Sequence, residues 1–196
     1  MNYLGHLYFS NNDTELMYAN IFGDFVKGKD LSRYPKKIQK GIRLHRTIDD
    51  YIDHHPAVIE LMHELYAPLP KIAGIAIDLY FDHLLAINWS DYHNLPLDDF
   101  IEKFQTASID REPYDKEFFW TVLSKMKEEE WLHHYQTTYG LTKACQGLSA
   151  RISFPNVLHT APQVFEENTQ KIETCFHIFM TDAVPFYRDY YAENGL

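Results

Sequence analysis

The segment that decides the fold is Gly41-Ile-Arg-Leu-His-Arg-Thr-Ile-Asp-Asp-Tyr-Ile-Asp-His-His-Pro56. Its apolar side chains recur at spacings of three and four residues, which is the period of a helix with one buried stripe. The stripe consists of Ile42, Leu44, Ile48, Tyr51 and Ile52. Because Pro56 disfavours the helical conformation at the residue before it, we expect the helix to end near His54. The segment predicts a long amphipathic helix.

Ionisable side chains lie beside this apolar stripe. His45, Asp49 and Asp53 are successive i, i+4 neighbours, so an imidazole and two carboxylates share one face of the helix. Arg46 and Asp50 form a second row next to them. A helix that only packs in a core does not need so many charges, whereas a metal or phosphate site does. The alternative interpretation is a buried ion-pair network around Arg46.

A second helix, expected over residues 71–89, repeats the same chemistry. It is apolar almost all round, which is typical of a buried helix, yet it carries Asp78, Asp82 and His83. Buried carboxylates are costly unless they are paired, hydrogen-bonded or bound to a cation. If the two helices face one another, their imidazoles and carboxylates form a ligand set that suits Mn²⁺, Fe²⁺ or Zn²⁺. Hydrolysis by a metal-activated water is then the most accessible chemistry, because the sequence has neither a glycine-rich phosphate loop nor a nucleophile elbow.

The rest of the chain is also helical in pattern. No alternating run with hairpin turns indicates a strand, and no linker divides the 196 residues. We therefore expect an all-α fold, a single-domain helical bundle that covers residues 1–196. Besides the two helices above, the pattern predicts helices near residues 14–22, 57–66, 97–108, 113–135, 140–150 and 161–191.

The composition limits the partners and the compartment. A formal net charge of -10 argues against general binding of nucleic acid. We see no signal peptide and no apolar run long enough to cross a membrane, and two cysteines do not make a disulfide framework. We expect a cytoplasmic protein without a membrane partner. The sequence leaves the oligomeric state open.

One segment departs from the acidic average. Between Lys27 and Arg43 there is a single acid, Asp30, and seven basic residues. The basic residues are Lys27, Lys29, Arg33, Lys36, Lys37, Lys40 and Arg43. This pattern indicates either a solvated loop and helix start or a docking surface for an anionic partner.

Several motifs together resemble one bacterial family. They are Asn2-Tyr-Leu-Gly-His6, Gly23-Asp-Phe-Val-Lys-Gly28, Gly41-Ile-Arg-Leu-His-Arg-Thr-Ile-Asp49, Asp53 with Pro56, and Asp78-Leu-Tyr-Phe-Asp-His83 followed by Trp89-Ser90. In their order and spacing they resemble the acyl carrier protein phosphodiesterases, a branch of the all-helical HD-type metal phosphohydrolases. A typical HD enzyme has an adjacent His-Asp pair, whereas the pair here is reversed, Asp82-His83.

The resemblance implies a fold, an activity and a cofactor. The expected fold is HD-phosphohydrolase-like, and the expected enzyme is a phosphodiester hydrolase that converts holo acyl carrier protein into the apo form and 4'-phosphopantetheine. The expected cofactor is a divalent metal, most readily Mn²⁺. The alternatives are an HD-type phosphohydrolase that acts on a nucleotide or another small phosphoester, and a helical binding protein without catalysis.

The residues and the resemblance together predict a site. We expect Asp24, His45, Asp82 and His83 to bind the metal, and Asn2, Asp53 and Asp78 to be additional ligands or to orient the ligands. We expect His6, Arg46 and Asp49 to be catalytic, with the planar guanidinium of Arg46 on the phosphate. The acidic carrier protein is expected to bind Lys27, Arg33, Lys36, Lys37, Lys40 and Arg43.

Overall fold

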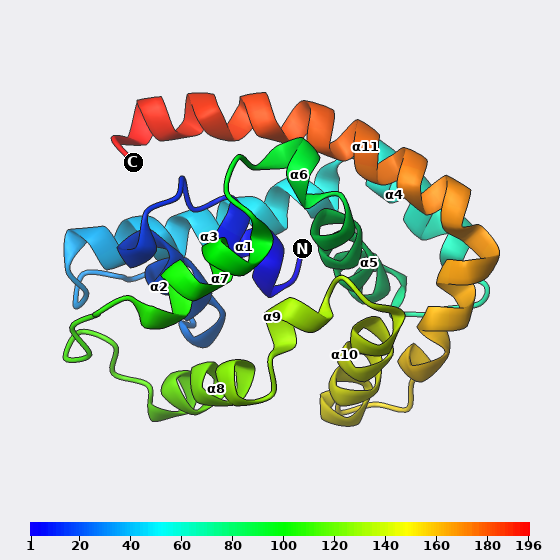
Figure 1. The fold of residues 1–196 in the computed structure, drawn as a ribbon, viewed down its shortest axis with the longest axis horizontal. Helices are drawn as coiled ribbons and strands as arrows, with labels where there is room; N and C mark the ends of the chain where they lie inside the picture. Colours follow the sequence, from blue (N-terminus) through cyan, green and yellow to red (C-terminus); the bar gives the residue numbers. More distant parts are fainter.

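In the structure, a computed structural model that describes residues 1–196, the two helices expected to face each other pack mainly on other helices, one on α2 and the other on α1, α4, α10 and α11 (Figure 1). The two expected helices are, in that order, α3 (Lys36–His54) and α5 (Ala73–Ile87). His55 leaves the helical conformation and α4 (Pro56–Leu65) begins at Pro56, whose missing N–H is no loss in the first turn of a helix. The end of the central helix is therefore as predicted.

All regular elements of the chain are helices, and it contains no strand. The remaining elements are α1 (Tyr3–Tyr8), α2 (Thr14–Phe22), the 3₁₀ turn η1 (Gly23–Phe25), α6 (Trp89–Tyr92), α7 (Leu97–Thr106), α8 (Glu117–Glu128), α9 (Trp131–His134), α10 (Thr138–Arg151), the 3₁₀ turn η2 (Leu158–Thr160) and α11 (Ala161–Asn194). One continuous cluster of 55 buried apolar residues connects them. The predictions of an all-α fold and of a single helical body are confirmed.

Helices α2 and α3 cross closely at a glycine. A Cβ atom on Gly41 would lie 2.3 Å from the Cβ of Ala19, which is far inside van der Waals contact. The side chain of Asp13 caps α2 by accepting a hydrogen bond from the backbone N–H of Leu16 at 3.1 Å. The close crossing brings η1, which follows α2 directly, against the middle of α3.

The C-terminal helix α11 arches over the other helices, from α10 past α4 and α5 to the start of the chain (Figure 1). It bends at Asn168, the one residue inside it with non-helical dihedral angles. Near its end, the hydroxyl of Tyr187 donates to the backbone carbonyl of Thr47 and that of Tyr191 donates to the carbonyl of Phe9. These bonds tie α11 to α3 and to the chain after α1.

The prediction of one helix over residues 113–135 is wrong. The chain becomes helical only at Glu117, and Glu130 adopts a left-handed conformation with φ of 52°, which separates α8 from the short α9. An L residue in this conformation ends a helix. The break turns α8 and α9 into one wall of a cavity whose opposite wall is α10. None of the helices is long and apolar enough to cross a membrane.

Candidate active site

Three side chains from two helices converge: His6 comes from α1, and His45 and Asp49 lie one turn apart on α3. The Nε2 atom of His6 lies 3.2 Å from Oδ1 of Asp49, and the Nε2 atom of His45 lies 3.2 Å from Oδ2 of the same carboxylate. The two imidazole rings are stacked, with centroids 4.2 Å apart. One ligand atom from each of the three residues lies within 4.8 Å of the others, which is close enough to share one metal ion.

A buried amide fixes the tautomer of His6. Asn20, inside the apolar helix α2, donates from Nδ2 to the backbone carbonyl of His6 at 2.8 Å and to Oγ of Ser10 at 3.0 Å. Its Oδ1 therefore faces Nδ1 of His6, 3.0 Å away, and must accept a hydrogen bond from it. In the neutral ring, Nε2 then has a lone pair directed at Asp49. Two lone pairs at this distance repel each other unless a proton or a cation lies between them.

His45 is neutral near pH 7 because it is buried. Burial, together with the charge of His6, lowers its pKa to about 3, although Asp49 acts in the opposite direction. Its Nδ1 atom is buried without a hydrogen-bond partner, so Nε2 is the only polar atom through which the ring contacts the site. A neutral imidazole is the form that binds a metal. Gly23 is needed here, because a Cβ on it would lie 2.5 Å from the Cβ of His45.

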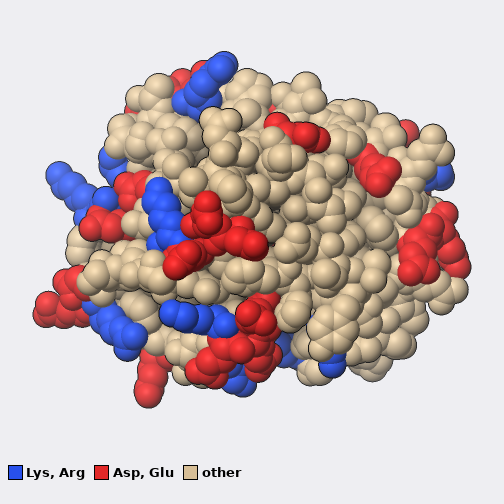
Figure 2. Space-filling view, viewed as in Figure 1, with Lys and Arg blue, Asp and Glu red and all other residues tan.

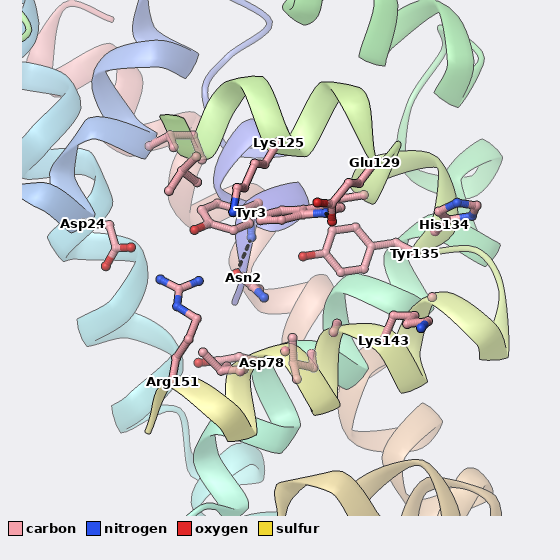
Figure 3. Close-up of a pocket in the computed structure, with 18 of the residues that line it drawn as sticks. Asn2, Tyr3, Asp24, Asp78, Lys125, Glu129, His134, Tyr135, Lys143 and Arg151 are labelled. Atoms are coloured by element: carbon pink, nitrogen blue, oxygen red, sulfur yellow. Dashed lines mark hydrogen bonds between the residues drawn. The ribbon is translucent and has the colours of Figure 1, made fainter. Parts of the chain in front are cut away.

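The three residues line a large cavity, about 1400 Å³ in volume. Asp24 from η1 also lines the cavity. Desolvation by the surrounding protein raises the pKa of its carboxyl group, although the residue is exposed to solvent on its cavity side. Asp78 lines the cavity too, and its Oδ1 accepts a hydrogen bond from the N-terminal ammonium group at 2.7 Å. Figure 3 shows Asp24 and Asp78 on different walls, with Arg151 between them.

Asp82 does not belong to this cluster, contrary to the prediction that it binds the metal. Its fully buried carboxylate accepts hydrogen bonds from the backbone N–H groups of Asn2, Leu4 and Gly5, at 3.1, 2.7 and 3.1 Å. These N–H groups are at the start of α1, where no carbonyl of the helix can accept them. Burial raises the pKa of Asp82 to about 6 even though these bonds and the N-terminal ammonium oppose the shift. Asp82 therefore anchors α1, the helix that carries His6.

His83 is likewise placed apart from the cluster. Its Nδ1–H donates to the backbone carbonyl of Tyr135 at 2.6 Å, and its ring packs edge-on against Phe165. The carbonyl can only accept, which settles the direction of the bond. His83 thus fixes the segment after α9, where Tyr135 lines the cavity. Each residue of the adjacent Asp82-His83 pair thus holds a separate segment that lines the cavity, Asp82 the start of α1 and His83 the chain after α9.

Arg46 also differs from expectation. Its Nη2 donates to the backbone carbonyls of Val26 and Gly28, at 3.1 and 2.7 Å, and the residue does not line the cavity. The guanidinium therefore holds the loop after η1 against α3. The interpretation of Arg46 in a buried ion-pair network is also not supported, because it forms no ion pair within 4 Å.

We expect Arg46→Ala to lower the free energy of unfolding by about 1–2 kcal/mol, because two hydrogen bonds from a charged donor are lost at a partly exposed site. Arg46→Lys keeps the charge but not the fork of donors, so its loss should be smaller. Urea unfolding measures both. A variant with unchanged stability and a turnover about 100-fold lower would instead indicate that Arg46 contacts the phosphate.

The other predicted residues divide into two groups. Asn2 lines the cavity and its side chain caps α1, whereas Asp53 is exposed and outside the cavity lining.

Among the basic residues, several make contacts within the chain. Lys37 pairs with Asp13 and Glu15, Lys40 donates to the carbonyl of Gly195, Arg33 pairs with Asp115, and Arg43 donates to Gln39. Lys27 and Lys36 are exposed and form no ion pair.

Charge is distributed unevenly over the molecule. Figure 2 shows basic and acidic side chains interleaved over the half of this face that contains α2, α7 and α8, and few basic side chains over the half formed by α5, α10 and α11. The protein therefore has no extended basic surface on this face. On this face an acidic partner would therefore meet basic side chains only within groups of mixed charge.

Sequence reasoning missed Asn20 and Arg151. Asn20 is a completely buried amide within the apolar run Leu16–Phe22, and a polar residue inside such a run is a usable signal. Arg151 ends α10 and lines the cavity, although it follows His6, His45 and Asp49 by more than a hundred residues in the sequence. No local pattern points to it, because only the packing of α10 brings it to the site.

Comparison with known proteins gives the family. A model of the acyl carrier protein phosphodiesterase family matches residues 1–183. Relatives called acyl carrier protein phosphodiesterase are 28% identical in Yersinia pestis and 27% in Klebsiella pneumoniae, each over 91% of this chain and 93% of the relative. A relative of that name in Escherichia coli is 26% identical over the same shares. No solved structure matches. The chain belongs to the acyl carrier protein phosphodiesterase family.

Proposed function

We propose that the protein is a divalent-metal-dependent phosphodiesterase that hydrolyses holo acyl carrier protein to the apo form and 4'-phosphopantetheine. The family supports the carrier protein as substrate. The observation that carries the metal dependence is the convergence of His6, His45 and Asp49 in the lining of a cavity large enough for a substrate. The relation to HD-type phosphohydrolases and the cytoplasmic location stay predictions.

The donor set fits a divalent metal ion. His6 directs Nε2 towards Oδ1 of Asp49 and His45 directs Nε2 towards Oδ2, and the bond to Asn20 leaves Nε2 of a neutral His6 ring with a lone pair. A cation removes the repulsion between that lone pair and the carboxylate. Two imidazoles and a carboxylate are acceptable ligands for Mn²⁺, which is the ion that the family resemblance implies. We propose that Asp24, which lines the same cavity, is an additional ligand of the metal ion.

Each protein group then has a definite task. A bound divalent cation supplies an activated water and neutralises charge on the phosphate. Asn20 holds the ring of His6 and its tautomer, and Asp82 holds the helix that carries it. Asp49 places its two oxygens beside the Nε2 atoms of the two imidazoles, so that one ion would contact all three side chains. Gly23 allows η1 to approach His45, which brings Asp24 to the same cavity.

The test uses purified holo acyl carrier protein, the full chain and Mn²⁺, with mass spectrometry of the products. We expect the carrier protein to lose the mass of the phosphopantetheine group and free 4'-phosphopantetheine to accumulate. Chelation should stop the reaction, and added Mn²⁺ should restore it. A parallel panel of nucleotides and small phosphoesters tests the alternative enzyme. Cleavage of a nucleotide but not of the carrier protein would overturn the substrate proposal, and activity in chelator would overturn the metal.

A further prediction concerns the docking of the carrier protein. Lys27, Lys29 and Lys36 are the lysines of the basic segment that are exposed and form no ion pair. We expect the Lys27→Glu, Lys36→Glu variant, which changes two of them, to lower kcat/KM for the carrier protein about tenfold. The loss should shrink as salt rises, because exposed charges are screened. Lys37 is unsuitable, since it pairs with Asp13, the residue that caps α2.

The matched control is Lys71→Glu, at an exposed lysine before α5 that forms no ion pair. This variant has the same type of charge change at another part of the surface, and its kcat/KM should stay near that of the unmodified protein. Both variants are also assayed with bis(p-nitrophenyl) phosphate, which has no carrier protein. An equal loss on both substrates would show that Lys27 and Lys36 shape the site instead of attracting the partner.

A further inference from the structure

The cavity extends well beyond the cluster of His6, His45 and Asp49. Its walls are α8 and α9 on one side and α10 on the other, and its volume of about 1400 Å³ exceeds that of most small-molecule sites. A phosphodiester group needs only part of this space. The remaining space is large enough for an elongated group that is attached to the phosphate.

The lining of that space is partly apolar and partly polar. The apolar part consists of Phe118 and Val122 from α8, Trp131 from α9, and Tyr139, Ala144 and Leu148 from α10. Polar groups lie among them, including Lys125, Glu129 and Lys143, as Figure 3 shows. Such a surface suits a flexible chain with both methyl and amide groups. The pantetheine part of the prosthetic group has this chemistry.

Arg151 lies where the cavity meets the cluster. Its side chain points into the cavity towards Tyr3 and Asp24 in Figure 3, it is the only arginine in the lining, and it forms no ion pair within 4 Å. Burial raises the pKa of Asp24, whereas the charges of His6 and Arg151 act in the opposite direction. An unpaired guanidinium with its fork of donors suits a phosphate oxygen pair. Arg46 cannot take this role while it is bound to two backbone carbonyls.

Gly147 leaves open space on the α10 wall of the cavity. It lies inside α10 and lines the cavity, and a Cβ atom on it would meet no other atom within 4 Å. The helix does not require glycine at this position, since its backbone dihedral angles are not left-handed. Gly147 is exposed, so a larger side chain at this position would project into the open space along α10 without displacing a neighbour.

We propose that the cleft between α8–α9 and α10 binds the phosphopantetheine arm, with Arg151 on its phosphate and the helix face around Gly147 against its pantetheine part. This inference rests on the proposed function, because it assigns the arm of that substrate to a place. It makes Arg151 a substrate-binding residue and makes the open helix face at Gly147 a determinant of specificity for the arm.

The first experiment fills the cleft. Gly147→Phe places a ring in the open space, so kcat/KM for holo acyl carrier protein should fall at least about tenfold, mainly through KM. The loss with bis(p-nitrophenyl) phosphate, which lacks the arm, should be much smaller. The control is Ala150→Phe, on the same helix but exposed and outside the cavity lining, which should behave as the unmodified protein. Thermal unfolding checks that each variant folds.

The second experiment removes the guanidinium. Arg151→Lys and Arg151→Met should lower kcat/KM for both substrates, the latter by about 100-fold, because both substrates contain the phosphodiester. Arg188→Met, at an exposed arginine of α11 outside the cavity, is the control. Gly147→Phe with unchanged kinetics, or with equal losses on both substrates, would overturn the arm subsite. Unchanged kinetics in Arg151→Met would overturn the phosphate contact.

A binding measurement separates this inference from the proposed function. Calorimetric titration of the full chain with 4'-phosphopantetheine in the absence of turnover should show binding that Gly147→Phe and Arg151→Met weaken at least about tenfold. Binding of this kind by a protein that does not cleave the carrier protein would overturn the proposed function and support the subsite. Cleavage without any effect of the two substitutions on binding would support the function and overturn the subsite.

Discussion

Replacing His45 by glutamine is expected to lower turnover of holo acyl carrier protein by about 10²–10⁴-fold while the fold is retained. The estimate corresponds to several kcal/mol of transition-state stabilisation from a metal site, at about 1.4 kcal/mol per factor of ten. Nε2 of His45 is one of the converging ligand atoms, and the ring makes no other polar contact that the fold would lose. The substitution therefore affects the site far more than the stability.

The measurement combines kinetics with metal binding. Mn²⁺ titration followed by electron paramagnetic resonance should show weaker binding in His45→Gln than in the unmodified protein, and circular dichroism should show the same helix content. His63→Gln is the control, at an exposed histidine of α4 that does not line the cavity. Full turnover with undiminished Mn²⁺ binding in His45→Gln would contradict the proposed metal site.

Removing the carboxylate of Asp82 is expected to destabilise the protein by about 3–5 kcal/mol. Asp82→Ala leaves the backbone N–H groups of Asn2, Leu4 and Gly5 without their acceptor at a buried position, and each such group costs about 1–3 kcal/mol. This is a large part of the 5–15 kcal/mol that is typical of a domain. Activity should fall as well, since α1 carries His6, but only as a consequence of the lost anchor.

Urea unfolding measures this loss, with Asp78→Ala as the matched control. Asp78 is also on α5 and also contacts the N-terminal segment, but it is half-buried and accepts only from the terminal ammonium, so a smaller loss is expected. If Asp82 were a metal ligand, Asp82→Ala would keep the stability of the metal-free protein and lose Mn²⁺ binding. That result would contradict the anchoring role.

The local parts of this protein could be predicted from the sequence. Apolar spacing and Pro56 determine α3 and its end, because both act within a few residues of the backbone. The pairing of His45 with Asp49 follows from the same geometry, since residues four apart lie on one face of a helix. The need of Asp82 for a partner was also predictable, because a buried carboxylate is costly on its own.

Only the tertiary structure decided which partner each polar group received. A buried carboxylate is satisfied equally well by a cation or by backbone N–H groups, and the docking of α1 onto α5 gave Asp82 the N–H groups. The same docking brought His6 to Asp49, and the packing of α10 brought Arg151 to the cavity. The free-energy cost of burying a charge is a property of the residue and its helix. The group that compensates the charge, by contrast, depends on chain segments that are distant in sequence.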